Sequence, residues 1–240
     1  MSENIKKNIK AFKVDLDSRE NQSILKPSTR CSNNQVHQVD EVNEVAKKID
    51  KLIKNAPYSN DDIILNHNEI KGAFFSPFKP QLKNAQVFLS HSHADKNEAL
   101  EVKNYLENQT KRKVFIDSLF WDYKDDVLSK LAKYDDISKI EDAFTLILRE
   151  SLEDMIKKCP YFVFLQSSNS VSNQWLSRNQ DLLKITYSAW IYEELKIAHS
   201  ISESRPIPMM ESMQVFHDIS PFLESFETIR LSELSRIINS

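Results

Sequence analysis

The chain of 240 residues contains one glycine, Gly72, where about 7% is usual in proteins. Glycine-rich loops that cradle phosphate, such as the P-loop and the dinucleotide fingerprint, are therefore excluded. Two cysteines, Cys31 and Cys159, are too few for a disulfide scaffold. The chain also lacks an apolar run near the roughly 20 residues of a membrane span, and its polar N-terminus has no signal-peptide core. These absences predict a cytoplasmic protein that does not enter a membrane.

Charges of the two signs are nearly balanced, with 32 Lys and Arg against 35 Asp and Glu and a formal net charge of −3. Proteins that bind nucleic acid or anionic membranes usually present a basic surface. We therefore expect neither nucleic acid nor membrane as a partner. The hydrophobic fraction of 40% and the charged fraction of 28% are ordinary for one globular domain with an extension.

The hydrophobic pattern divides the chain into three regions. Residues 1–39 are polar with little periodicity, which predicts a flexible N-terminal segment. Residues 40–84 predict an amphipathic helix over 41–55, ended by Pro57, and then an irregular connector. Residues 85–240 alternate apolar strands with helices and are predicted to form the folded domain.

The alternation in residues 85–240 predicts an α/β fold of the flavodoxin-like type, with a central parallel five-stranded sheet and helices on both faces. The predicted strands are 87–89, 113–116, 161–165, 207–210 and 226–231. In such sheets ligands bind beyond the carboxyl ends of the strands. Three predicted loops leave those ends and should carry the functional site: 90–94, 117–121 and 166–188.

The strand that ends in Ser90 continues as His91-Ser-His93-Ala-Asp95. Imidazole and carboxylate groups at this spacing suit zinc, as at the start of a metallo-β-lactamase fold, which is an αββα sandwich. However, Lys96 stands where that motif continues with histidine, and the next hundred residues contain no further histidine. A zinc-dependent hydrolase therefore stays as an alternative, and the loop has a second interpretation below.

A Trp and a Glu four residues apart begin the helix predicted over 189–200. On a helical wheel centred on Ile191, Glu194 lies about 60° and Trp190 about 100° to the same side. The wheel places Glu194 at the edge of a cleft, outside the core, and places Glu193 nearly opposite, in solvent. The ordinary structural interpretation is a boundary glutamate that supports a core tryptophan.

Taken in order, these segments resemble a Toll/interleukin-1 receptor (TIR) domain. The strand and loop over 86–95 resemble the family's V-F-[IL]-S-[HY]-S, and residues 113–117 resemble the second strand leading into its BB loop. Residues 155–165 resemble its passage from helix to third strand. Ser188-Ala-Trp-Ile-Tyr-Glu-Glu-Leu195 resembles S-x-W-x-x-x-E-L of TIR domains that cleave NAD+. The resemblance covers about residues 85–235, and it departs from the family at 117–123, which lacks the Gly or Pro of many BB loops.

The resemblance implies an NAD+ glycohydrolase or cyclase that gives nicotinamide and either ADP-ribose or a cyclic ADP-ribose isomer. It maps the family's catalytic glutamate onto Glu194 and implies NAD+ as a substrate, with no cofactor and no metal. The residues predicted to bind the substrate lie near Glu194 or at strand ends: Ser90, His91, Ser92, Asp117, Phe120, Trp121, Ser188 and Trp190.

The resemblance also implies partners. Self-association through the TIR domain is expected, as is a role in bacterial anti-phage immune signalling with a downstream effector that senses the nucleotide product. A non-catalytic TIR adaptor, which acts only by binding other TIR domains and leaves Glu194 idle, is the alternative.

Overall fold

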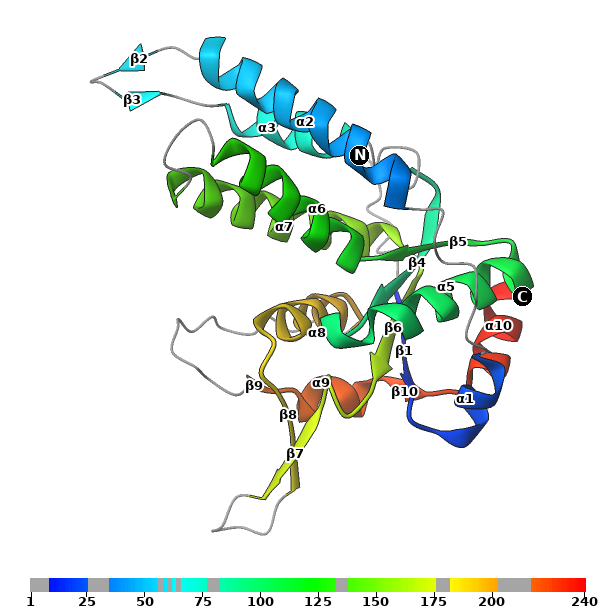
Figure 1. Cartoon of the computed structure of the whole chain (residues 1–240). Coiled ribbons are helices and arrows are strands. Elements are labelled where there is room, and N and C mark those ends of the chain that lie inside the picture. The colour runs from blue at the N-terminus through cyan, green and yellow to red at the C-terminus, as the bar shows by residue number, and fades with distance from the viewer. Residues whose placement is uncertain are drawn as a thin grey trace, which may run out of the picture. The chain divides into compact units, whose positions relative to one another are not determined.

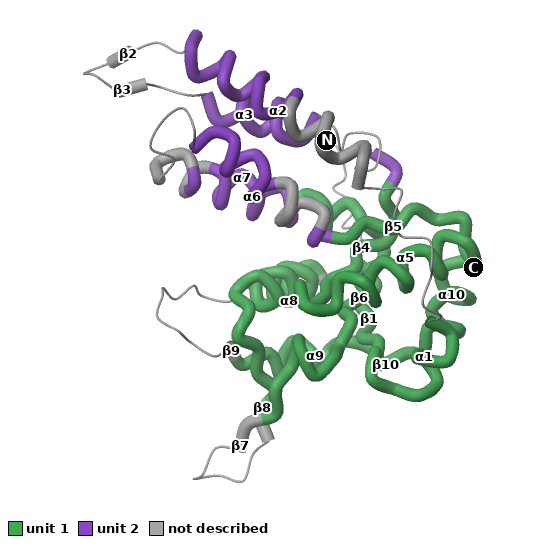
Figure 2. Tube along the Cα trace, in the orientation of Figure 1, with its two compact units in different colours: residues 1–27, 85–116, 153–240 green, residues 28–84, 117–152 purple. Residues whose placement is uncertain are grey.

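The computed structural model describes residues 9–25, 35–55, 58–59, 62–63, 66–76, 83–132, 138–175, 182–202 and 217–240. The chain divides into two compact units, shown in green and purple in Figure 2. The first unit contains residues 1–27, 85–116 and 153–240, and the second contains residues 28–84 and 117–152. Each unit buries its own set of apolar side chains.

The first unit is built on a five-stranded, all-parallel sheet with strand order β10-β1-β6-β4-β5 (Figure 1). The strands are β1 Lys10–Asp15, β4 Ala85–Ser90, β5 Lys113–Ile116, β6 Tyr161–Gln166 and β10 Glu227–Thr228. The two strands β4 and β6 are buried along most of their length, as their continuous apolar sequences require. The predicted α/β class with a parallel five-stranded sheet is confirmed, and the architecture is consistent with a flavodoxin-like fold.

A row of aromatic rings crosses one face of this sheet. Phe88 of β4 lies opposite Phe115 of β5 and Phe162 of β6, with ring centroids 5.4 and 5.6 Å apart. Phe226 extends the row, 5.6 Å from Phe162. Aromatic side chains bury large apolar areas, and neighbouring pairs across strands stabilise a sheet. The row therefore stabilises the alignment of the strands, and so the positions of their carboxyl ends at the edge of the sheet.

The N-terminal segment departs from the prediction. β1 lies between β6 and β10, with Lys10 opposite Tyr161. Its Phe12 and Val14 are buried, so it contributes to the core of the first unit. The predicted flexible segment 1–39 is therefore wrong for residues 10–25, where β1 and the short helix α1 Arg19–Ile24 lie. It is also wrong for residues 35–39, which are helical. β1 supplies one of the five strands, whereas the predicted strand 207–210 lies outside the described residues.

The remaining helices of the first unit are α5 Lys96–Thr110, α8 Ala189–Ser202, α9 Ser220–Ser225 and α10 Leu231–Asn239. α8 packs on β1 and β4, whereas α5 contacts β5 and α10. Figure 1 shows α8 and α10 on opposite sides of the strands. The segment predicted as a loop over 166–188 instead contains a β-hairpin. Its strands are β7 Ser172–Trp175 and β8 Leu182–Thr186, and β9 His217–Asp218 pairs with β8.

The second unit is mainly helical. Its helices are α2 Gln35–Asn55, α3 His67–Phe74, α6 Ser118–Leu131 and most of α7 Ser138–Lys158. A short antiparallel pair of strands, β2 Tyr58–Ser59 and β3 Asp62–Ile63, lies between α2 and α3 in the chain. α2 contacts α3 and α6 and buries Val45 and Ile49, so the predicted amphipathic helix is present, although it begins at Gln35 and not at residue 41. Phe74 of α3 meets Phe144 of α7 edge to face at 5.1 Å. Among the described helices, none combines the length and the apolar character needed to cross a membrane.

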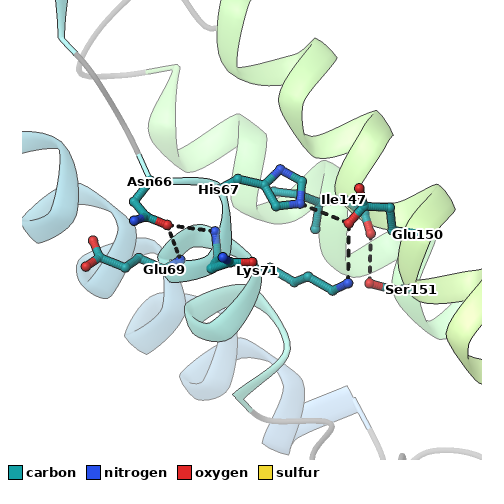
Figure 3. A network of polar contacts seen from close by, with 8 residues as sticks. Asn66, His67, Glu69, Lys71, Ile147, Glu150 and Ser151 are labelled. Carbon is teal, nitrogen blue, oxygen red and sulfur yellow. Dashed lines mark hydrogen bonds and ion pairs between the residues drawn. The ribbon is translucent and has the colours of Figure 1, made fainter.

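A polar network joins α3 to α7 in the second unit (Figure 3). Asn66 caps α3, since its Oδ1 accepts backbone N–H groups of the first turn. His67 Nε2 and Lys71 Nζ lie 3.0 and 3.4 Å from the same oxygen of Glu150. The hydrogen bond from His67, followed by the contact with Lys71, lowers the pKa of Glu150 against the opposing effect of desolvation.

Candidate functional site

The N-terminus of α8 is capped by side chains that precede it. Ser188 Oγ accepts the backbone N–H of Ile191 at 3.3 Å, and Ser188 C=O accepts that of Tyr192 at 3.1 Å. Thr186 Oγ1 accepts the N–H of Ser188 at 3.2 Å. These bonds pair polar groups that the first helical turn leaves open. The structure thus gives Ser188, which was predicted to bind substrate, the role of N-cap.

In the sequence, α8 comes after the point where the chain leaves the carboxyl edge of the parallel sheet. β6 ends there at Gln166, and the chain must return to the opposite edge before it enters β10 in the parallel direction. α8 lies on this crossover and packs on β1 and β4. A crossover helix begins near the carboxyl edge, which is where α/β proteins bind ligands. Trp190 and Glu194 lie in these first turns.

Glu194 is fully buried, with 0% of its surface exposed. Ile191, Leu195 and Ala198 are also buried, which confirms the apolar face that the wheel predicted. The wheel's placement of Glu194 outside the core, at a cleft edge, is wrong. The buried arc of α8 is wider than one apolar stripe because the helix packs on the sheet and also on α9. Acidic side chains are almost never buried this completely unless they are paired or used in function.

Trp190 and Glu193 differ from Glu194 in exposure. Trp190, one turn before Glu194 on the same flank, is half-buried. The Glu193 side chain keeps 23% of its exposure and lies 3.7 Å from Lys196 Nζ. The predicted solvent-facing Glu193 is therefore only partly exposed. The two adjacent acids nevertheless have different environments, which makes them a matched pair for mutagenesis.

The outer flank of α8 is held by α9. The rings of Tyr192 and His199 lie 5.5 and 5.4 Å from that of Phe222, and His199 Nδ1 is 2.9 Å from Ser225 Oγ. Burial, and then the charge of Glu193, raises the pKa of Tyr192. With the sheet on one side and α9 on another, the rotation of α8 about its axis is fixed, and so is the direction in which Glu194 points.

Lys13 links the N-terminal strand to this part of the unit. Its Nζ donates to the backbone C=O of Leu223 in α9 at 2.5 Å. Burial lowers the pKa of Lys13, the charge of Lys184 lowers it further, and Glu224 acts in the opposite direction. β1 therefore supports the candidate site twice, through its packing against α8 and through its contact with α9.

The carboxyl end of β4 supplies the second group of candidate residues. Ser90 is opposite Phe164 in the ladder and is 0% exposed, and His91 is 4% exposed. Ser92 is half-buried, whereas His93 is exposed. In the described part of the chain, no three His, Cys, Asp or Glu side chains form a group that could hold a metal ion. The zinc-hydrolase alternative thus has no ligand set there, and an all-parallel sheet differs from the αββα sandwich that it predicts.

The segment predicted as a loop over 117–121 is helical. α6 starts at Ser118, directly after β5, and the buried Asp117 occupies its N-cap position. Phe120 and Trp121 lie in the first turn of α6, and their side chains are outside the described part of the structure. These residues belong to the second unit. The candidate site of the first unit therefore comprises Ser90, His91, Ser92, Ser188, Trp190 and Glu194.

Asp95 was not predicted as a site residue, yet it connects two loops at this edge. Its Oδ2 accepts the hydroxyl of Ser167 at 2.5 Å, and its Oδ1 accepts Nδ2 of Asn169 at 2.6 Å. Asp95 is 4% exposed and Ser167 is 6% exposed. A sequence signal exists, since Ser167-Ser-Asn-Ser170 follows a buried strand directly, as the His91–Asp95 segment follows β4. Polar segments that leave neighbouring parallel strands meet at one edge of the sheet.

Comparison of the chain with models of protein families, with curated proteins and with solved structures gives no match. The residues of the candidate site, with their burial and contacts, are therefore the basis for assigning a function.

Proposed function

We propose that this chain is a TIR-type enzyme that cleaves the nicotinamide–ribose bond of NAD+, with Glu194 as the catalytic carboxylate. The complete burial of Glu194 in the second turn of α8 carries the proposal. Burying a carboxylate costs stability, and chemistry is one reason to retain it at such a position. Trp190 one turn earlier and the capping Ser188 complete the motif that resembles NAD-cleaving TIR domains.

One carboxylate is sufficient for this reaction. Glycosidases usually need a second acid that protonates the leaving group. In NAD+ the nicotinamide nitrogen is already cationic. When the C1′–N bond breaks, its electron pair neutralises the ring, and nicotinamide leaves without accepting a proton. The ribose acquires oxocarbenium character, which a fixed carboxylate in a site of low dielectric constant stabilises.

The second step decides the product. A water molecule that attacks C1′ and loses one proton gives ADP-ribose, whereas attack by another group of the same molecule gives a cyclic isomer. Ser90, His91 and Ser92 at the end of β4 would supply hydroxyl and imidazole groups for the ribose and phosphate oxygens. Trp190 would offer an aromatic face to a base. Asp117, Phe120 and Trp121 of the second unit stay predicted substrate contacts.

The burial of Glu194 has a consequence for regulation. A ribose ring cannot reach a carboxylate that is 0% exposed, so catalysis requires a rearrangement that uncovers it. We assign the trigger to self-association through the TIR domain. A low basal rate then suits a signal generator in bacterial anti-phage defence, whose nucleotide product is read by a downstream effector in the cytoplasm.

The direct test is incubation of the purified chain with NAD+ and separation of the products by chromatography. We expect one nicotinamide for each ADP-ribose or cyclic isomer, with a rate per molecule that rises with protein concentration. A crowding agent should raise the rate further by favouring assembly. No nicotinamide at any concentration, with or without the agent, would contradict the proposal.

A non-catalytic TIR adaptor is the second candidate, and the same burial favours it if Glu194 serves only the packing of α8. In that case Glu194→Gln should lower the melting temperature or change self-association, and neither the parent chain nor the variant should release nicotinamide. The product assay and a melting curve on the same samples therefore separate the two functions.

A further inference from the structure

We infer that Asp95 is a positioning residue, which holds the His91–Ser92 dipeptide in place at the carboxyl edge of the sheet. The inference rests on the proposed function in one respect only, since that function gives His91 and Ser92 the task of contacting NAD+. The contacts of Asp95 themselves do not depend on the reaction.

The His91–Ser92 dipeptide is fixed at both ends. On one side, Ser90 is held in the β4–β6 ladder opposite Phe164. On the other side, the backbone N–H of Asp95 donates to the C=O of Ser92 at 2.8 Å and closes the turn. The Asp95 side chain then connects this turn to the loop after β6. That connection ties the turn of the dipeptide to a second loop at the same edge of the sheet.

The loop after β6 directs two hydrogen-bond donors, one from Ser167 and one from Asn169, at the side chain of residue 95. Ser167 Oγ accepts the backbone N–H groups of Asn169 and Ser170 at 3.1 and 3.2 Å, so its own proton is the group left for Asp95. Asn169 Nδ2 is also a donor. A carboxylate accepts at both oxygens, whereas an amide accepts at one atom and donates at the other. Asparagine at position 95 therefore keeps an acceptor for only one of the two donors, Ser167 and Asn169.

A matched control exists on the other side of the same loop. Asp17, which follows β1, accepts the backbone N–H of Ser168 through Oδ2 at 2.9 Å. Asp17 is exposed, and its Oδ2 contacts the loop after β6. Asp17→Ala therefore removes one acidic contact from that loop and leaves the link between the loops in place.

The experiment exchanges the acceptor Asp95 and the donor Asn169 between the two positions. Asp95→Asn leaves one acceptor for two donors, and Asn169→Asp places two carboxylates against each other. The double variant with Asp95→Asn and Asn169→Asp restores one donor facing one acceptor, keeps an acceptor for Ser167 and keeps the net charge. Asn169 is exposed, so Asn169→Ala gives a further variant that loses one bond without a buried change.

Two readouts require no turnover. One is the NMR signal of the His91 ring, and the other is hydrogen exchange at the backbone N–H groups of Asn169 and Ser170. We expect Asp95→Asn to shift the His91 signal and to speed the exchange about tenfold. Asn169→Ala should give a smaller change in the same direction. The double variant should return both readouts towards the parent values, and Asp17→Ala should leave the His91 signal unchanged.

Where NAD+ turnover is measurable, Asp95→Asn should raise KM more than it lowers kcat, and the double variant should restore KM. An unchanged His91 signal in Asp95→Asn, or a double variant no better than the two single ones, would overturn the inference.

If Asp95→Asn does not fold, a folded double variant supports the contact between residues 95 and 169. An unchanged His91 signal in Asn169→Ala then counts against the inference. A parent chain without NADase activity refutes the proposed function, while the NMR and exchange results still decide the role of Asp95.

Discussion

Phe12 of β1 and Val163 of β6 lie opposite each other in the parallel ladder, although one is near the N-terminus and the other is in the second half of the chain. Both side chains are buried. β1 also pairs with β10, so the N-terminal segment is an interior strand of the sheet. The site on α8 therefore depends on residues that precede it by most of the length of the chain.

Phe12→Ala should lower the free energy of unfolding by about 3–5 kcal/mol, the usual cost of removing a buried phenylalanine. Lys10→Ala, at an exposed position of the same strand, should change it by less than about 0.5 kcal/mol. Urea denaturation followed by circular dichroism measures both values. Deletion of residues 1–17 should abolish cooperative unfolding of the first unit. A deletion variant with the parent transition would show that β1 is dispensable.

The outer edge of β5 is closed by two side chains of α5. Glu107 Oε1 accepts the N–H of Val114 at 3.0 Å, Lys103 Nζ donates to the C=O of Val114 at 2.7 Å, and the two side chains pair at 2.7 Å. They satisfy outward backbone groups as a neighbouring strand would. Glu107→Ala should therefore cost about 1–3 kcal/mol, because it leaves a partly buried N–H without its acceptor.

The control for this substitution is Glu153→Ala, which removes an exposed ion pair with Lys157 on α7. Exposed pairs one helical turn apart contribute little, so we expect a loss below about 0.5 kcal/mol. Urea denaturation of the two variants gives the comparison. Equal losses would mean that Glu107 acts only as a surface charge and not as a partner of the β5 backbone.

The network around Glu150 predicts a pH dependence of the second unit. Its contacts with His67 and Lys71 lower the pKa of Glu150 in the folded protein below the ordinary value of 4.5. The stabilisation is therefore complete above that value and is lost as the pH falls through the lower folded pKa. Between pH 7 and pH 3, Glu150→Gln should show a smaller fall in melting temperature than the parent chain.

Glu69→Gln provides the control for Glu150. It removes a carboxylate from α3 that points away from the network in Figure 3. Melting curves at matched salt concentration across the same pH range test the two variants side by side. A Glu150→Gln variant whose melting temperature falls as steeply as that of the parent would contradict a stabilising role for this network.

The strands β4, β5 and β6 and the helix α8 could be predicted because each carries a strong local pattern. β4 and β6 are continuous apolar runs, and α8 has apolar residues at helical spacing. β1 also has a local signal, since Phe12, Val14 and Leu16 alternate with Lys13 and Asp15. That signal is six residues long within a polar region, and the partners of the strand are far away in the sequence.

The burial of individual polar residues was harder to predict. A wheel describes one helix by itself, so it did not include α9, which with the sheet encloses α8 and widens its buried arc. The link from Asp95 to Ser167 depends on two loops that become neighbours only when β4 and β6 pair. The order of motifs along the chain thus predicts the edge of the sheet where the candidate site lies, whereas its internal contacts require the folded structure.

Glu194 and the adjacent Glu193 form a test residue and its control. Glu194→Gln preserves shape but removes the charge, so it should lower nicotinamide release by about 10²–10³-fold, the cost of losing a transition-state electrostatic contact. Its melting temperature should stay within about 4 °C of the parent value, the shift expected for roughly 1 kcal/mol. Glu194→Ala is less suitable, because truncating a fully buried side chain leaves a cavity.

Glu193→Gln, which alters the partly exposed neighbour, should retain nearly all of the activity. The measurement is the rate of nicotinamide release from NAD+ by the parent chain and both variants at high protein concentration with a crowding agent. We expect activity in the parent chain and in Glu193→Gln, and its loss in a folded Glu194→Gln. Equal rates in the two variants would contradict the assignment of Glu194 as the catalytic carboxylate.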